Sequence, residues 1–221
     1  DGKSLHEFGI DAKQVSQPDT QTALHLGFPS LMLRCRLFST SGLMTTNDPF
    51  SAFDLNDFWE DSDYARKVYV GSLFNDQDVS EVEGELGYKL PSSYVALMRN
   101  QNGGIPRLTN YRTNERTSWA DDHVSITGIY SIGRDMTCSL CGEFSCAFWV
   151  EEWGYPPIGI YFADCPSGGH DMICLDYREC GPRGEPTVVH VDQEDNYKIT
   201  YLAKDFESFI RGLEGNDAFE T

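Results

Sequence analysis

Apolar residues recur at helical spacing in two neighbouring segments near the middle of the chain. Val79, Val82 and Leu86 fall at i, i+3 and i+7, which predicts a helix over 76–86 that ends at Gly87. Pro91 suits the first position of a second, shorter helix, because no hydrogen bond is lost there with the missing N–H. We expect the buried face of this second helix to comprise Tyr94, Val95, Leu97 and Met98.

The pattern predicts one further helix before this pair and a run of strands after it. Aromatic residues favour an initial helix over 57–69, and the polar segment 107–117 is expected to be a loop. Alternating apolar residues predict a strand over 123–132, and segment 143–153 predicts a helix that ends before Gly154. Four more strands and a closing amphipathic helix are expected over 158–163, 171–177, 187–191, 197–202 and 206–213.

This order of elements predicts an α+β fold with a single, mostly antiparallel sheet flanked by helices. The main domain is predicted to span residues 51–221, and residues 1–50, rich in Ser, Thr and Gln, are expected to form a loosely structured extension. Two short motifs are expected to shape the scaffold. Their residues are Leu90, Pro91, Tyr94, Asn102, Gly103 and Gly104 in the helical region, and Gly168, Gly169, His170 and Asp171 before a strand.

Composition adds a strong negative charge. The chain has 221 residues and a net charge of −18, and residues 1–50 carry five acids against four bases, which leaves −17 for the rest. Such a surface repels phosphate backbones, which argues against nucleic-acid binding, and it attracts basic proteins. Solubility alone is the simpler interpretation of the same charge. No apolar run approaches the roughly 18 residues that a membrane helix needs, so we expect no membrane partner.

Cysteine usage favours the cytoplasm. The chain has seven cysteines, an odd number, and is too long to need disulfide staples, so we expect free thiols. Cys138 and Cys141 form a CxxC pair, with Cys146 following, that resembles half of a zinc site. The candidates for a second pair, which are spaced irregularly, are Cys165, His170, Cys174 and Cys180. We therefore expect no metal ligands and no cofactor.

Two arrangements bear on catalysis. A cysteine nucleophile would require Cys141 or Cys165 beside a histidine base, but no known nucleophile signature surrounds either cysteine. The candidate bases are His170 and His190. The Gly-Gly-His-Asp run at 168–171 also suggests a hydrolase, although a glycine turn that leads into a strand explains it as well. The sequence predicts no enzymatic activity, with this hydrolase as the less favoured alternative.

Two segments join tryptophan to carboxylates, which is typical of protein-binding surfaces because aromatic anchors dominate interfaces. The candidate partner-binding residues are Trp119, Asp121, Asp122, Glu151, Glu152 and Trp153. Two alternatives stay open. The tryptophans can belong to the core with solvated acids beside them, or the paired carboxylates can serve acid–base hydrolysis.

Segment 86–104, LGYKLPSSYVALMRNQNGG, resembles the SUKH superfamily, specifically its Smi/Knr branch. GIYFAD at 159–164, GGHD at 168–171, LDY at 175–177 and VVHVD at 188–192 extend the resemblance toward the closing helix. The resemblance implies an α+β binding fold without established enzymatic activity. Bacterial members are immunity proteins that neutralise toxins, often nucleases, and fungal members are regulators of cell-wall synthesis. It implies here a cytoplasmic immunity protein that occludes a basic toxin, such as a nuclease domain, with a regulatory scaffold as the alternative.

Overall fold

The computed structural model describes residues 48–219, which contain five α-helices and eight short strands. The prediction for residues 1–50 lies almost wholly outside this range. The helices are α1 (Asp63–Val68), α2 (Asp76–Leu86), α3 (Ser92–Asn100), α4 (Cys146–Trp153) and α5 (Phe206–Arg211). The strands are β1 (Asn110–Arg112), β2 (His123–Ser125), β3 (Gly128–Ile129), β4 (Gly159–Asp164), β5 (Asp171–Asp176), β6 (Thr187–Asp192), β7 (Lys198–Ala203) and β8 (Leu213–Glu214).

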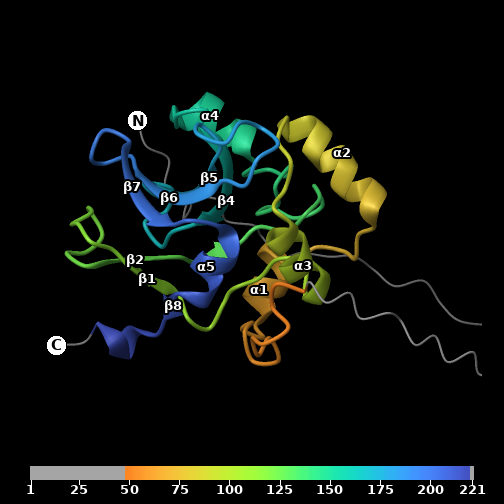
Figure 1. The fold of residues 1–221 in the computed structure, drawn as a ribbon, viewed down its shortest axis with the longest axis horizontal. Helices are drawn as coiled ribbons and strands as arrows, with labels where there is room; N and C mark the ends of the chain where they lie inside the picture. Colours follow the sequence, from red (N-terminus) through yellow and green to blue (C-terminus); the bar gives the residue numbers. More distant parts are fainter. Residues whose placement is uncertain (1–47, 220–221) are drawn as a thin grey trace, which may run out of the picture. The chain divides into compact units, whose positions relative to one another are not determined.

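The strands form two antiparallel sheets, so the α+β class is confirmed and the single sheet is corrected to two. The larger sheet has the order β3-β4-β5-β6-β7, and the smaller has the order β2-β1-β8. In the larger sheet each strand pairs with its neighbour in the sequence, because the connections between β4 and β7 are short. Figure 1 shows β1, β2 and β8 together beside this sheet, and α1, α2 and α3 gathered at its other end.

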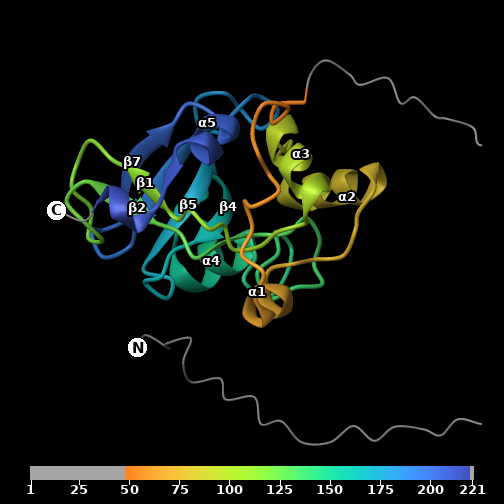
Figure 2. The ribbon, with the colours of Figure 1, turned by 90° about the horizontal axis from the view of Figure 1, so that it is seen from below.

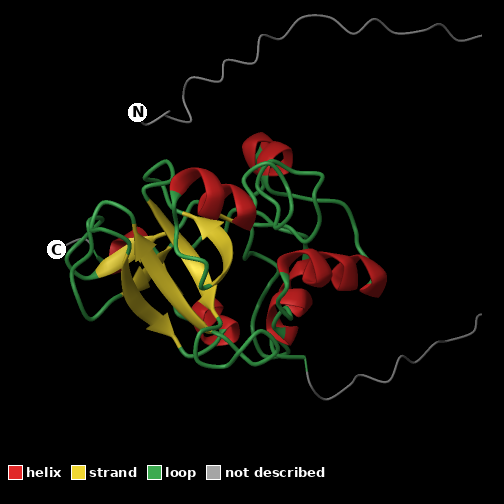
Figure 3. Ribbon diagram, turned by 90° about the horizontal axis from the view of Figure 1, so that it is seen from above, coloured by secondary structure: helices red, strands yellow, loops and turns green. Residues whose placement is uncertain are grey.

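Helices α4 and α5 cover opposite faces of the larger sheet (Figures 2 and 3). On the α5 face, the ring of Phe162 in β4 packs edge-on against Tyr94 of α3 and Phe206 of α5, with ring centroids 6.0 and 5.4 Å away. On the α4 face, the neighbouring Tyr161 packs against Tyr155, with ring centroids 5.2 Å apart. The alternation of successive strand residues between the two faces therefore places aromatic layers on both sides.

The helix pair α2–α3 forms as its sequence predicts. Asn75 caps α2 in a reciprocal capping box with Asp78, and Gly87 ends it in the left-handed conformation with φ of 77°. Pro91, expected at the first helical position, occupies the cap position instead, and α3 begins one residue later at Ser92. Leu90 beside it is buried.

The Asn-Gly-Gly sequence after α3 joins three segments. The Nδ2 group of Asn102 donates hydrogen bonds to the carbonyl oxygens of Ser72 and Ile132, and its Oδ1 accepts one from the Ile132 N–H. Gly103 has φ of 82°, and a Cβ there would lie 2.4 Å from the Tyr69 carbonyl oxygen. Gly104 forms an antiparallel bridge with Ile129 of β3. Glycine is therefore required at position 103, where a side chain would meet the backbone of a neighbouring segment.

Five predicted elements are wrong in extent. Helix α4 begins at Cys146, three residues after the expected start, and α5 ends at Arg211, because Leu213 belongs to β8. The other three differ more. The initial helix begins at Asp63, where Ser62 caps it, because Trp59 belongs to a bridge with Pro106 instead. The expected loop 107–117 contains β1, and the expected strand 123–132 is divided between β2 and β3, which belong to different sheets. The four central strands are confirmed to within one residue at each end.

Candidate partner-binding surface

The connection between β1 and β2 carries the first group of predicted binding residues. The Trp119 side chain is 42% exposed, and it lies in a turn where Thr117 Oγ1 accepts hydrogen bonds from the N–H groups of Trp119 and Ala120. Asp121 is exposed but forms an ion pair with Arg116 at 3.1 Å. Asp122 contacts His123 at 2.9 Å and forms a longer ion pair with Arg112 at 3.9 Å. The two aspartates at this position are therefore partly neutralised by neighbours.

The second group occupies the end of α4. Glu151 and Glu152 are exposed, and Trp153 is half-buried, with its ring 5.5 Å from that of Trp149 and 5.8 Å from that of His170. Gly154, with φ of 74°, ends the helix directly after the tryptophan. The carboxylates therefore point into solvent while Trp153 is fixed against its neighbours.

The turn between β6 and β7 lies between these two groups. On one side, the Asp192 carboxylate accepts a hydrogen bond from the Ser118 N–H at 2.8 Å, beside Trp119. On the other side, the Tyr197 hydroxyl donates to the Trp153 carbonyl oxygen. In Figure 1 this turn and the β1–β2 connection project from the same end of the domain, far from α2 and α3.

We call this end the loop face. It is defined by residues 113–122, 151–153, 166–170 and 193–197. It carries seven exposed carboxylates and one arginine, Arg116; the carboxylates are Glu115, Asp121, Asp122, Glu151, Glu152, Glu194 and Asp195. Sequence reasoning missed the third group, Glu194 and Asp195, because only the contacts between loops show that the β6–β7 turn joins the two tryptophan segments.

The Gly-Gly-His-Asp turn is the part of the loop face that lies against the core. Gly169 has φ of 101°, and a Cβ there would lie 2.9 Å from the Trp149 ring. His170 binds Gln193 twice, through its carbonyl oxygen and through Nδ1, which lies 3.0 Å from Gln193 Oε1. Pockets beside α2, α3 and Tyr177 are lined by residues other than 168–171. The geometry therefore gives these residues a role in shaping the loop.

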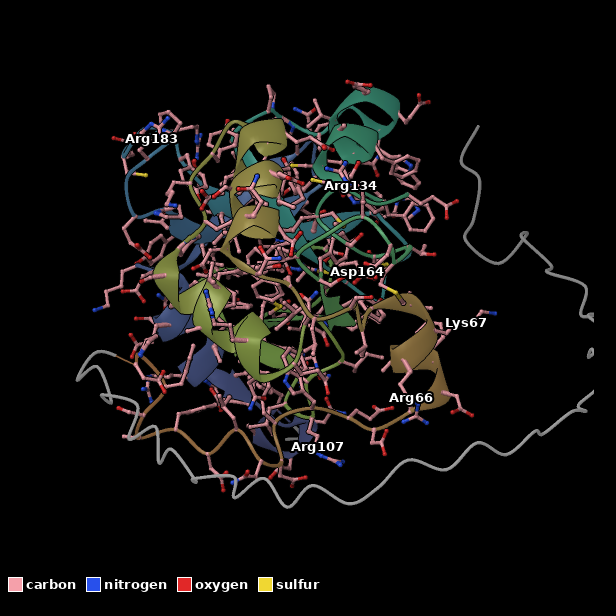
Figure 4. The ribbon with its side chains drawn as sticks, turned by 90° about the vertical axis from the view of Figure 1, so that its right-hand side faces the viewer. Arg66, Lys67, Arg107, Arg134, Asp164 and Arg183 are labelled. Carbon is pink, nitrogen blue, oxygen red and sulfur yellow. The ribbon has the colours of Figure 1, made fainter. Side chains whose placement is uncertain are left out.

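The charge of the domain is unevenly compensated. Eleven of the thirteen lysines and arginines after residue 50 form ion pairs with nearby acids. Labelled bases such as Arg66, Arg107 and Arg183 lie at the edge of the domain in Figure 4. Because thirty acids share these thirteen bases, most carboxylates keep a negative charge that no partner offsets. On the loop face, Glu151, Glu152 and Asp195 form no ion pair with any described residue.

The cysteines lie apart from this surface. Cys138 is buried, and burial raises the pKa of Cys141 to about 12 and that of Cys146 to about 11. Cys146 Sγ lies 3.1 Å from the Gly159 carbonyl oxygen, as a packed thiol does. Within residues 48–219, the one group of three or more possible metal ligands with converging atoms is Cys165, Asp171 and His190. Sequence reasoning considered the cysteine and the histidine but not this aspartate as their shared neighbour.

The described residues form an α+β domain with two antiparallel sheets. Residues 74–212, more than half of the chain, match the SMI1 / KNR4 family (SUKH-1). The chain belongs to this family, whose domains are in general non-catalytic immunity or regulatory proteins. No curated protein and no solved structure matches the chain significantly. Among the described helices, none combines the length and the apolar character that crossing a membrane requires.

Proposed function

We propose that this domain is a cytoplasmic immunity protein that neutralises a basic toxin, such as a nuclease domain, by covering its active-site cleft with the loop face. One observation carries the proposal: the β6–β7 turn unites two tryptophan-bearing segments into a single acidic surface. Family membership supports a role in protein binding. The cysteines of residues 48–219 are free thiols, which is consistent with a reducing compartment.

In the proposed mechanism, carboxylates affect the rate of association and the tryptophan ring affects the affinity of the complex. Exposed carboxylates such as Glu151 and Asp195 attract a basic cleft and speed the encounter at low salt, because the field of the domain steers the approaching partner. Trp119 then supplies affinity, since its side chain is 42% exposed and presents a large apolar area at low entropic cost. Occlusion requires no chemistry from the domain itself.

The first experiment tests rescue. The candidate toxin is the product of the gene adjacent to the one that encodes this chain, and the two proteins are produced together in a sensitive host. We expect growth to be restored and a complex to be recovered by size-exclusion chromatography. Absence of both rescue and complex would overturn the proposed function. A complex between the loop face and a non-toxic cellular protein would replace immunity by the regulatory-scaffold alternative.

The second experiment locates the surface. Trp119→Ala is expected to weaken the complex about 30-fold, which corresponds to about 2 kcal/mol for a buried aromatic anchor. The double substitution Glu151→Gln/Glu152→Gln is expected to slow association about tenfold at low salt, with the effect disappearing at high salt.

A matched control removes two charges far from the loop face. Glu60→Gln/Glu81→Gln neutralises two exposed acids near α1 and on α2, at the other end of the domain. This variant is expected to leave the association rate within about twofold of the unmodified protein. If both double variants slow association equally, net charge alone attracts the partner and the loop face is not the interface.

A further inference from the structure

Three adjacent segments of the larger sheet bring a thiol, a carboxylate and an imidazole to one point. Cys165 directly follows β4, whose last residue pairs with Met172, so it lies beside Asp171 at the start of β5. His190 of β6 pairs with Ile173, which places it diagonally across from Asp171 on the same face of the sheet. One donor atom from each of the three side chains lies within 4.8 Å of the other two.

The group is fully enclosed and incompletely hydrogen-bonded. Asp171 and His190 have side-chain exposures of 2% and 0%, and Cys165 is 2% exposed. His190 Nε2 lies 2.7 Å from Asp171 Oδ2, which is the hydrogen bond that joins them. Asp171 Oδ1 and His190 Nδ1 are buried without a hydrogen-bond partner among the described residues. Buried polar atoms nearly always have partners, so these two atoms leave the cluster able to bind a water molecule or an ion.

We propose that Cys165, Asp171 and His190 bind a zinc-class divalent cation. Thiolate, imidazole and carboxylate are the three ligand types that Zn²⁺ takes in proteins, at about 2.0–2.3 Å from the metal. Tetrahedral ligands at those lengths stand roughly 3.3–3.8 Å apart. The three donor atoms lie within 4.8 Å of one another, and ligation by both His190 Nε2 and Asp171 Oδ2 would replace their 2.7 Å hydrogen bond. The thiolate and the carboxylate together balance the double positive charge, so the buried site becomes neutral.

The site is buried. Its three protein ligands would leave one position of a tetrahedral ion to a water molecule, whereas a closed structural zinc site has four protein ligands. Tyr155 and Trp149 of the α4 face cover the glycine turn next to the site, because the Tyr155 hydroxyl donates to the Gly169 carbonyl oxygen and the Trp149 ring contacts Gly169. A bound ion would therefore tie together the strand ends that support the loop face. The site is not recognisable from the sequence, because its three ligands lie in separate segments. The CxxC pair, which is the usual signal of a zinc site, lies elsewhere in the chain.

The test measures metal in the intact full-length chain. We expect one zinc ion per chain by elemental analysis of protein purified without chelator. After chelation, Co²⁺ is expected to restore binding and to give a thiolate-to-cobalt charge-transfer band in the near ultraviolet. Zinc at a hundredfold excess over its Kd is expected to raise Tm by about 5–10 °C. A metal-free protein with neither cobalt band nor Tm shift would overturn the proposal.

Variants assign the site. Cys165→Ala is expected to abolish the cobalt charge-transfer band, and His190→Gln is expected to weaken cobalt binding at least tenfold. Cys174→Ala is the matched control, because Cys174 is equally buried in β5 but lies outside the cluster. A band that survives Cys165→Ala and disappears in Cys138→Ala/Cys141→Ala would overturn the assignment. If Cys165→Ala does not fold, the cobalt band of the wild-type protein tests for a thiolate ligand. Asp171→Asn, which is expected to weaken cobalt binding, then tests the position of the site.

Discussion

The stability of this domain should depend on the protonation of one residue, Asp164, at the end of β4. The Tyr69 hydroxyl contacts its carboxylate oxygens at 2.9 and 3.1 Å, and Asp164 lies inward of Arg66 and Lys67 in Figure 4. Burial raises the pKa of Asp164 from its ordinary value of 3.8 to about 7, although the hydrogen bond from Tyr69 opposes the rise. The folded protein thus holds this proton more tightly than the unfolded chain does.

The sign and size of the effect follow from linkage. Protonated Asp164 contributes its full stability below about pH 4, and this contribution is lost as the pH rises toward 7. The reason is that the unfolded chain releases this proton near pH 4, whereas the folded protein holds it until about pH 7. A difference of about 3 in pKa corresponds to about 4 kcal/mol in the free energy of unfolding. Asp164 keeps some solvent exposure, so we expect the measured loss to be about 2–4 kcal/mol.

The perturbation is Asp164→Asn, which keeps the shape of the side chain and removes its titration. Urea unfolding followed by tryptophan fluorescence at pH 4.5, 5.5, 6.5 and 7.5 gives the free energy of unfolding of each protein. The wild-type protein should lose about 2–4 kcal/mol relative to the variant across this range, and the difference should level off above pH 7. Asp195→Asn, which removes an exposed carboxylate, controls for the change in charge. Parallel pH profiles for wild type and Asp164→Asn would refute the reasoning.

Two further substitutions test close packing and buried hydrogen bonds. Gly169→Ala should destabilise the domain by about 3 kcal/mol, because its φ is 101° and the added methyl meets the Trp149 ring. The neighbouring Gly168→Ala, at φ of 73° with open space around it, should cost only about 1 kcal/mol. Equal losses in urea unfolding would contradict the ring contact. Asn102→Ala should cost about 3 kcal/mol, because this buried side chain makes three hydrogen bonds, two of them fully buried. As a control, the substitution Asn56→Ala at an exposed position should change stability by less than about 0.5 kcal/mol. Thermal unfolding measures the stability of both asparagine variants.

Long periodic elements of the fold were predictable because burial imposes their pattern on the sequence. Helix α2 spans the predicted residues, since Val79 and Val82 are buried at helical spacing and Gly87 ends it with positive φ. The strands β4 to β7 are recoverable for the same reason, because each has six residues and turn residues at both ends.

Short elements were not predictable, because they carry no period. Strands β3 and β8 have two residues each, and β1 has three. The apolar residues of 123–132 suit one strand, but the Ile126 N–H bonds to Thr109 and the Thr127 N–H bonds to Asp164. The chain thus passes from the small sheet to the large one within two residues. Only tertiary contacts decide where that transfer occurs.

The surface residues were likewise predictable only in part. The tryptophans and acids of 119–122 and 151–153 were recognisable from composition, but their relation to one another was not. That relation depends on hydrogen bonds between segments far apart in the sequence, from the Ser118 N–H to the Asp192 carboxylate and from the Tyr197 hydroxyl to the Trp153 carbonyl oxygen. A sequence pattern records which side chains are buried, and it does not record which loops meet.

Because the buried pattern and the loop tips are independent, a domain with the proposed function can change its partner without losing its fold. The loop face is held by groups that substitution at the tips leaves intact: the Asp192 carboxylate beneath the turn, the Tyr155 hydroxyl on Gly169, and main-chain bonds. The tip residues Glu194 and Asp195 are exposed and take no part in the core. Their charges can vary at little cost in stability, because surface substitutions away from caps and networks seldom exceed about 0.5 kcal/mol. Specificity can therefore reside in the tips while the strand ends below them, including Cys165, Asp171 and His190, stay fixed.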